Sequence, residues 1–360
     1  MKSKSTIGFC GDVMLARDFL KVQKIRVLDS VLSEDLLRRF SNIDYLIANL
    51  ETPICSGNMK AGDFFMPPDY AELLTHFECM SLANNHIFDC GETGVVETIA
   101  TLNKLNVGFT GIYSNSNDLW YPRIIASTAG NISLIGCIED SLYPEFAVSS
   151  FSILKLSDLL NSSLLSELDE RENIVANVVL LHAGKEFTPF PSRKLVESAR
   201  KLVVKGADLV IISHSHFVSG FERTAEGGMI LYGLGDFIFD VPVSGRKASV
   251  VPIFEISKNG LSFSEILFTK RTSDLTVNLV EDKKEIRKLH RKIEKYSKLL
   301  SNNPEALRIR VVSKLHVWNY QLSRIMWMIR SEGFKTTVRF LLDVLKRGVR
   351  KTFVHLRGRE

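Results

Sequence analysis

The sequence lacks paired cysteines and long apolar runs. Its five cysteines are odd in number, widely spaced and free of CxxC motifs, which argues against a disulfide framework or a zinc knuckle and favours a reducing compartment. No stretch reaches the roughly 20 apolar residues of a spanning helix, and no apolar signal segment follows Met1. We therefore expect a cytoplasmic protein without signal peptide or transmembrane helix, able at most to attach peripherally to the inner face of a membrane.

Charge is distributed unevenly along the 360 residues. The formal net charge is +5, yet Val280–Glu360 carries 21 Lys and Arg against 8 Asp and Glu, which leaves 25 basic and 33 acidic residues before it. Up to about residue 270, short apolar runs alternate with helical patterns, and beyond about 280 only helical patterns remain. We expect an α/β domain at residues 1–275 and a basic helical extension at residues 276–360.

Within the α/β region the pattern predicts particular elements. Helices are expected at Glu92–Leu105, Ser192–Val204 and Lys283–Leu300, and the segment Asp158–Asn173 is a helix or a loop insertion. Two adjacent runs at 122–137 indicate a hairpin and hence a mixed sheet. Strands are expected at 5–10, 44–48, 79–83, 107–110, 122–127, 131–137, 174–181, 208–212, 229–232, 248–256 and 262–268.

Polar residues suited to metal binding follow several of these strands. They are Asp12, Glu51, Asn84-Asn85-His86, His182 and His214-Ser215-His216. Because strand ends meet at one edge of a sheet flanked by helices, these side chains can converge although the sequence separates them. Imidazole combined with carboxylate favours an ion of the Mn, Fe or Zn type, whereas Mg or Ca would favour oxygen alone. We predict one or two divalent metal ions at this edge.

Each of these residues also has a simpler explanation. A Gly-Asp step such as Gly11-Asp12 is often only a turn, and Asn84-Asn85 could shape a left-handed turn. A single buried histidine such as His182 is more often a hydrogen-bonded core residue than a ligand. The recurrence at five strand ends, with a His-x-His among them, favours the metal site.

Six motifs, taken in order, carry a family resemblance. They are Gly11-Asp12-Val13-Met14-Leu15-Ala16-Arg17, Asn49-Leu50-Glu51-Thr52-Pro53, Leu82-Ala83-Asn84-Asn85-His86-Ile87-Phe88-Asp89, His182-Ala183-Gly184-Lys185-Glu186-Phe187, a run from Gly206 to His216, and a run from Tyr232 to Asp240. The set resembles the CapA family, associated with capsule and poly-γ-glutamate synthesis and similar to calcineurin-like metallophosphoesterases. The resemblance covers about residues 5–240 and implies a four-layer α/β/β/α sandwich with mixed sheets.

The resemblance also implies roles for single residues. Asp12, Glu51 and His216 would surround one metal, with Glu51 placed to bridge, and Asn85, His182 and His214 would serve the other. His86 matches the catalytic histidine that in phosphoesterases stands outside the metal shell and stabilises or protonates the leaving oxygen, with Asn85 beside it.

Three further residues are candidates for substrate binding. Arg17 could meet an anionic group or form a salt bridge to the acidic domain, and Glu186 could support a ligand histidine rather than act as a base. Asn84 completes this group.

Two departures from the family pattern bear on the metals. Phosphoesterases normally carry Asp-x-His at the first site, but the residue two after Asp12 is Met14, which leaves the first metal with fewer ligands. Asp236 stands where the family usually has Asn, and its charge could strengthen cation binding or repel an acidic substrate.

The basic extension has several interpretations. It could be a solvated helical hairpin packed on the domain. Alternatively, Lys335–Arg359 could attach to an anionic membrane, with Trp318, Trp327 and Phe340 at the lipid headgroups. An anionic polymer would also be attracted there, whereas the absence of a recognisable nucleic-acid module disfavours nucleic acid.

Two functional hypotheses follow. The first is a metal-dependent hydrolase that cleaves a phosphate ester or an acyl or amide bond of a cell-surface polymer, such as capsule or poly-γ-glutamate, or of its precursor. The second is a non-catalytic accessory protein that holds an anionic polymer beside a membrane-associated synthase.

Overall fold

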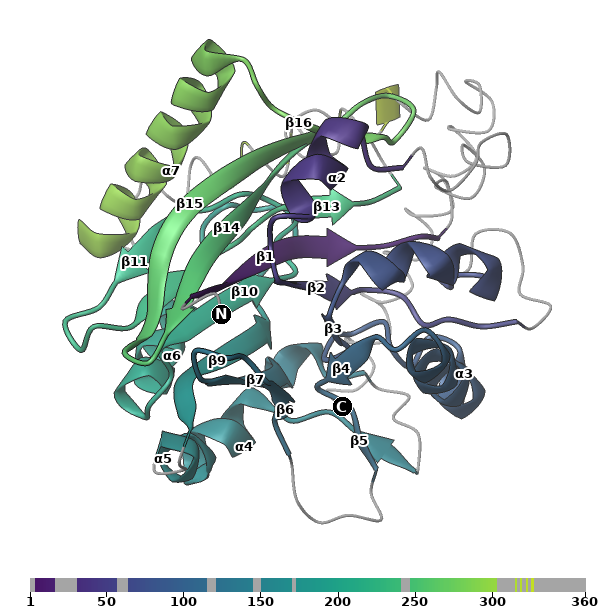
Figure 1. Ribbon diagram of the computed structural model, residues 1–360, viewed down its shortest axis with the longest axis horizontal. Helices are drawn as coiled ribbons and strands as arrows, with labels where there is room; N and C mark the ends of the chain where they lie inside the picture. Colours follow the sequence, from purple (N-terminus) through teal and green to yellow (C-terminus); the bar gives the residue numbers. More distant parts are fainter. Residues whose placement is uncertain are drawn as a thin grey trace, which may run out of the picture.

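Two β-sheets form the centre of the protein in a computed structural model (Figure 1). The structure describes residues 4–16, 31–56, 64–114, 121–144, 150–169, 173–240 and 247–302, with helical positions at 315, 318, 322, 325 and 326. Arg17, Trp327 and the segment Lys335–Arg359, which contains Phe340, lie outside the described residues.

The first sheet combines parallel and antiparallel strands. Its order is β16 (Val277–Leu279), β15 (Gly260–Arg271), β14 (Ala248–Ser257), β1 (Ser5–Val13), β2 (Tyr45–Leu50), β3 (Cys79–Ser81) and β4 (Gly108–Thr110). From β1 to β4 the strands are parallel, and β14 to β16 run antiparallel. An eighth strand, β13 (Asp236–Ile238), pairs in parallel with the end of β1.

The second sheet has a parallel centre with antiparallel edges. Its order is β11 (Phe221–Arg223), β12 (Met229–Leu231), β10 (Leu209–Ser213), β9 (Ile174–His182), β7 (Asn131–Ile138) and β6 (Arg123–Ile125). The β6–β7 pair is antiparallel, as the expected hairpin requires. A separate two-stranded ladder joins β5 (Tyr113–Ser114) to β8 (Phe151–Ser152).

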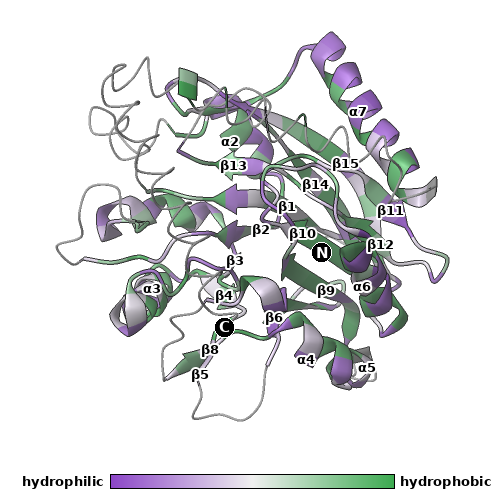
Figure 2. Ribbon diagram, turned by 180° about the vertical axis from the view of Figure 1, so that it is seen from behind, coloured by the Kyte–Doolittle hydropathy of each residue, from purple (hydrophilic) through white to green (hydrophobic). Residues whose placement is uncertain are grey.

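Successive side chains along the strands point alternately toward the other sheet and toward the helices. In β9, Val178 belongs to the apolar core between the sheets, whereas its neighbour Val179 belongs to the core under the helices of the second sheet. In β2, Ile47 likewise points between the sheets and Ala48 points outward. Because side chains alternate with a period of two, each of these strands contributes to the core between the sheets and to the core under the helices. Both faces of each sheet are therefore buried, and the strands are accordingly apolar in Figure 2.

Helices form the outer layers. On the first sheet, α2 (Glu34–Phe40), the 3-10 helix η2 (Pro68–His76) and α3 (Gly91–Lys104) pack on the outer core. On the second sheet, α4 (Leu156–Asn161), α5 (Leu164–Asp169) and α6 (Arg193–Val204) do the same, and a short 3-10 turn, η3 (Asp140–Leu142), follows β7. The result is the expected four-layer α/β/β/α sandwich with mixed sheets.

The region after residue 275 contributes to this packing. The strand β16 extends the edge of the first sheet, and α7 (Lys283–Asn302) lies against the second, where the Phe221 amide donates to Ser297 Oγ at 2.8 Å. Tyr296 on α7 meets Phe190 with ring centroids 4.7 Å apart. Among the described residues, no helix combines the length and apolarity needed to cross a membrane.

Most differences from the expected elements concern short segments. The strands β5, β8, β11, β13 and β16, of two or three residues each, were not expected. The segment Asp158–Asn173 contains α5 and the end of α4, so it is mostly helical. The strand β1 runs three residues further than expected, to Val13, because β13 pairs with its end.

A glycine permits the close approach of β1 and β13. A Cβ atom on Gly11 would lie 1.8 Å from the carbonyl oxygen of Gly235, so no other residue fits without moving one strand. This contact brings Asp12 into register with Asp236 at the sheet edge.

Replacing Gly11 with alanine tests this contact. Because the added methyl group overlaps backbone, we expect Gly11→Ala to lower the free energy of unfolding by about 3 kcal/mol, measured by urea denaturation. Gly8→Ala is a control in the same strand, since the nearest atoms to its Cβ would be the movable end of the Leu46 side chain, at 2.9 Å, and the Ile43 side chain, at 3.4 Å. Equal losses for the two variants would contradict the explanation.

Candidate metal centre

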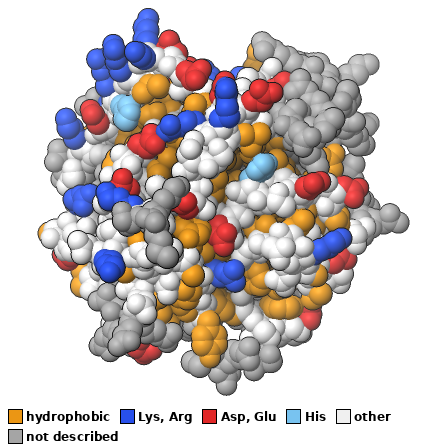
Figure 3. All heavy atoms as spheres, in the orientation of Figure 1, with side chains coloured by type: hydrophobic (Ala, Val, Ile, Leu, Met, Phe, Trp, Pro, Cys, Tyr) orange, Lys and Arg blue, Asp and Glu red, His pale blue; other side chains and the backbone are white. Residues whose placement is uncertain are grey.

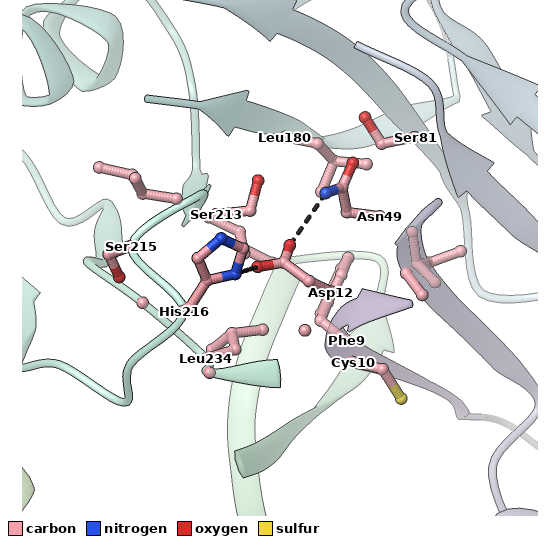
Figure 4. A pocket seen from close by; sticks show the side chains of 17 residues that line it. Phe9, Cys10, Asp12, Asn49, Ser81, Leu180, Ser213, Ser215, His216 and Leu234 are labelled. Carbon is pink, nitrogen blue, oxygen red and sulfur yellow. Dashed lines mark hydrogen bonds and ion pairs between the residues drawn. The ribbon is translucent and has the colours of Figure 1, made fainter. Parts of the chain in front are cut away.

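The first sheet contributes carboxylates to the shared edge. Asp12 lies at the end of β1 and is 2% exposed, and its Oδ1 accepts a hydrogen bond of 2.9 Å from the amide of Asn49 at the end of β2 (Figure 4). Glu51 directly follows β2, where its backbone N–H donates to the Val13 carbonyl at 2.9 Å. The strand ends therefore place both carboxylates in the interior.

Glu51 is the least compensated of these groups. It is 1% exposed, and its Oε2 atom has no hydrogen-bond partner among the described residues. Burial, followed by the negative charge of Asp12, raises the pKa of the Glu51 carboxyl well above its usual value. A buried carboxylate oxygen without a hydrogen-bond donor needs a bound cation or a proton to offset the cost of its burial.

The second sheet contributes histidines. His182 ends β9, and its Nδ1 lies 3.0 Å from the Oγ of Ser213, its register partner on β10. Its Nε2 lies 2.8 Å from Oδ1 of Asn85, in the turn after β3. Ser213 and Asn85 thus engage the two ring nitrogens of His182 and fix the orientation of the ring.

The loop after β10 carries His214 and His216 in strained conformations. Their φ angles are +89° and +61°, which residues with a side chain rarely adopt. The Nδ1 atom of His214 is buried and has no hydrogen-bond partner among the described residues. Burial, then the neighbouring His216, lowers the pKa of His214 to about 3, and burial also lowers the pKa of His182 well below its usual value. Both rings therefore stay neutral and able to act as ligands.

His216 lies between three carboxylates. Its Nδ1 is 2.9 Å from Asp236 Oδ1 and 3.4 Å from Asp12 Oδ2, while its Nε2 is 3.8 Å from Glu51 Oε1. Figure 4 shows the ring facing Asp12 across the gap between the sheets. His216, in the loop after β10 of the second sheet, thus contacts the carboxylates of the first sheet.

Asn84 and His86 have different surroundings. Asn84 is fully buried, and its amide donates to the Leu50 carbonyl at 2.7 Å while its Oδ1 accepts from the His86 backbone at 3.1 Å. The His86 ring is partly exposed, with its Nδ1 2.7 Å from Asp89 Oδ2 and its face stacked on Phe64 at 3.8 Å. Asn84 thus holds the turn that presents His86 beside the centre.

Among the residues that the structure describes, three overlapping groups of side chains can hold a metal ion. Within each, the potential ligand atoms lie within 4.8 Å of one another, and the groups are Glu51 with His182 and His214, Glu186 with His214 and His216, and Asp12 with His216 and Asp236. Glu186 is half-buried beside the last two histidines. The unpartnered Glu51 and His214 atoms, with their mixed oxygen and nitrogen donors, fit divalent ions of the Mn, Fe or Zn type.

Some contributors were not among the predicted site residues. Asp89 belongs to the quoted motif, and its spacing of three from His86 on a turn could have revealed the pair. Ser213 lies directly before His214 in the quoted run from Gly206 to His216, so its place in that motif is the signal that could have revealed it. Arg271, whose guanidinium reaches Asp236 at 3.2 Å, lies 35 residues away in a strand without a motif, so no signal in the sequence identifies it.

A small cavity lies between the two sheets, next to the proposed centre. It measures about 20 Å³, close to the size of one water molecule. Its polar lining includes Asp12, Asn49, Ser213 and His216 (Figure 4). The ligand residues consequently rest on a tightly packed floor rather than on an open channel.

The fold and the site define a two-sheet α/β protein with a histidine–carboxylate centre at its strand ends. The bacterial capsule synthesis protein family PGA_cap matches residues 6–241, and the chain belongs to this family. The match ends shortly after β13, so it spans every proposed ligand.

Individual relatives agree with this assignment. The chain is 26% identical over 274 residues to the PGA biosynthesis protein CapA of Bacillus subtilis (strain 168), covering 72% of this chain and 70% of that protein. It is 23% identical over 278 residues to the capsule biosynthesis protein CapA of Bacillus anthracis, covering 73% and 67%. Among solved structures, the calcineurin-like phosphoesterase YfkN from Bacillus subtilis aligns with a TM-score of 0.43 and 14% identity, covering 82% of this chain and 99% of that one.

The raised pKa of Glu51 predicts how stability varies with pH. In the metal-free protein the folded state keeps the Glu51 proton to a higher pH than the unfolded state does, so stability should fall as pH rises above the ordinary glutamate pKa of about 4.3. Each unit of pKa difference contributes about 1.4 kcal/mol. Glu51→Gln should flatten this decline, measured by urea denaturation in EDTA between pH 5 and 8. Parallel curves for variant and wild type would show that Glu51 does not titrate in this way.

Proposed function

We propose that the protein is a metal-dependent hydrolase in the synthesis of capsule, poly-γ-glutamate or another cell-surface polymer. The reaction would cleave a phosphate ester or an acyl or amide bond of the polymer or its precursor. The observation that carries the proposal is the pair of buried, unpartnered ligand atoms, Glu51 Oε2 and His214 Nδ1, at the meeting point of the two sheets. Family membership supports the pathway.

The donor set supports a centre for one or two ions. Asp12, Glu51 and His216 would hold the first ion, and Asn85, His182 and His214 the second, with Glu51 shared because it lies near both groups. When bound, such ions supply Lewis acidity and lower the pKa of water. The neutral histidines need lose no proton, whereas Glu51 must lose its own.

His86 can act on the leaving group. Its Nδ1 is held by Asp89 and its ring by Phe64, so the orientation of the imidazole is fixed while the side chain remains 22% exposed. A histidine held in this way can donate a proton to the leaving oxygen or nitrogen, or stabilise the charge that develops there.

Exposed basic residues support an anionic substrate or polymer partner. Lys284, Lys288, Arg291, Lys295 and Lys298 recur along α7 at spacings of three and four, so they share one face of the helix. In Figure 3, Lys and Arg side chains gather over α7 at the upper left. A polymer with regularly spaced carboxylates or phosphates would match this face electrostatically, as would the anionic surface of a membrane.

One observation favours the alternative of a non-catalytic accessory protein. Met14 is fully buried and packs with Ala16 and Phe239, so the position of the first-site histidine of phosphoesterases carries an apolar side chain. With fewer ligands the first ion would bind more weakly. In that case the same surface would hold an anionic polymer without cleaving it.

Two histidine variants separate binding of metal from catalysis. We expect His214→Ala to lose metal, measured by elemental analysis, because it removes a ligand. We expect His86→Ala to keep its metal but to lose about 10²–10⁴-fold in turnover of bis(4-nitrophenyl) phosphate or γ-glutamyl-4-nitroanilide. His290→Ala is the matched control, since this exposed histidine on α7 only meets Phe268.

Other outcomes point elsewhere. Equal metal loss in both variants would make His86 a ligand. A wild-type protein that holds metal and binds polyglutamate but hydrolyses neither probe would support the accessory role. A wild-type protein without metal affinity would contradict the proposed centre.

A further inference from the structure

A buried arginine lies behind the proposed centre. Arg271, at the end of β15, is 1% exposed and the bulkiest of the fully buried side chains among the described residues. Its Nη2 donates to Asp236 Oδ2 at 3.2 Å, and its guanidinium lies 5.9 Å from the centre of the Phe239 ring. An arginine so deeply buried requires a charged partner, and Asp236 is 0% exposed as well.

Asp236 connects this arginine to a proposed ligand. One carboxylate oxygen, Oδ2, accepts from Arg271, and the other, Oδ1, lies 2.9 Å from His216 Nδ1. The latter is an ordinary hydrogen-bond distance. The three side chains thus form a line from the first sheet to the loop after β10, with the carboxylate held at both ends.

This line determines which nitrogen of His216 carries the proton. Nδ1 faces the carboxylates of both Asp236 and Asp12, at 2.9 and 3.4 Å, so it is the nitrogen that donates. In a neutral ring the lone pair then lies on Nε2, which faces Glu51 Oε1 at 3.8 Å. We propose that Arg271 and Asp236 are positioning residues that fix His216 in the Nδ1–H tautomer, with Nε2 directed to the metal shared with Glu51.

An asparagine at position 236 would not serve Arg271 equally well. Its amide presents one oxygen, so it could accept from Nδ1–H or from the guanidinium, while its NH₂ group would face the remaining donor. The carboxylate satisfies both and neutralises the buried cation. The aspartate and the arginine are therefore a matched pair. The proposal that they position His216 rests on the part of the proposed function that concerns the metal.

The geometry disfavours Asp236 as a direct ligand. Asp12, His216 and Asp236 do lie close enough for an ion between them. In that arrangement Nδ1 would be the ligand atom, and Nε2 would carry the proton. That proton would point toward Glu51, where a cation is also proposed. Oδ2 of Asp236 is moreover engaged by Arg271. The two arrangements require opposite tautomers of His216, which makes them distinguishable.

The first experiment reads the tautomer without metal. Imidazole ¹⁵N spectra of the full-length protein in EDTA, assigned by comparison with His216→Gln, should show Nδ1–H for His216. In Asp236→Ala this signature should be lost. An Nε2–H tautomer in the wild type overturns the proposal. This measurement needs neither turnover nor bound metal, so it stands even if the proposed hydrolase activity fails.

The second experiment measures zinc affinity by calorimetry. We expect Asp236→Ala to weaken binding about 10- to 100-fold, the usual cost of losing the partner of a ligand histidine. Arg271→Met should weaken it as well. Arg271→Met leaves the buried Asp236 carboxylate without its arginine. If this variant does not fold, the double variant Asp236→Asn/Arg271→Met, which removes both charges, provides a second test.

Thr269→Val separates positioning from general destabilisation. Thr269 is fully buried on the same strand, two residues before Arg271, and its hydroxyl meets Ser249 Oγ at 2.6 Å, so its loss should lower the melting temperature but not the zinc affinity. The proposal is overturned if Asp236→Ala binds zinc within about twofold of wild type, or if Thr269→Val weakens zinc binding as strongly.

Discussion

Three buried carboxylates at the shared edge of two sheets are the constraint on which the centre depends. Asp12, Glu51 and Asp236 are each at most 2% exposed, and removing such charges from water is costly unless each is paired. Arg271 neutralises Asp236, and Asn49 with His216 supports Asp12. Glu51 is left with an unsatisfied oxygen, so a proton or a cation must complete the balance.

The same burial prepares the second sheet to supply ligands. Desolvation opposes charge on His182 and His214 and lowers their pKa values, whereas it raises the pKa of Glu51. The rings of His182 and His214 are thereby neutral before a cation binds, whereas Glu51 has a proton to release. The positive φ values of His214 and His216 show that the backbone is held in an unfavourable shape to direct these rings inward.

Sequence patterns predict this edge because several long apolar runs are each followed there by a polar residue. Long strands such as β9 are buried on both faces and end in a ligand, so an apolar run followed by a polar residue predicts both the strand and His182. Asp89 and Ser213 are local to known motifs and could have been inferred. Arg271 could not, since it contacts Asp236 only through the packing of β15 near β13, and no local pattern encodes a contact between distant strands. The short strands β13 and β16 escape prediction for a related reason: pairing with longer neighbours, not their own sequence, makes them strands.

Met14, at the position where phosphoesterases normally carry a histidine, changes the environment of the proposed centre as well as its set of donor atoms. Met14, Ala16 and Phe239 form an apolar cluster against which Phe64 packs. Phe64 stacks on His86, while Phe239 meets His216 with ring centroids 4.9 Å apart and lies under Arg271. One apolar wall therefore contacts the proposed proton donor, a proposed ligand and the internal cation. Because His216, Arg271 and Asp236 are buried behind this wall, the electrostatic interactions among these three are strengthened. With Met14 in place of a histidine, the proposed first ion would have fewer ligands, so the orientation of His216 by Asp236 would contribute more to holding it.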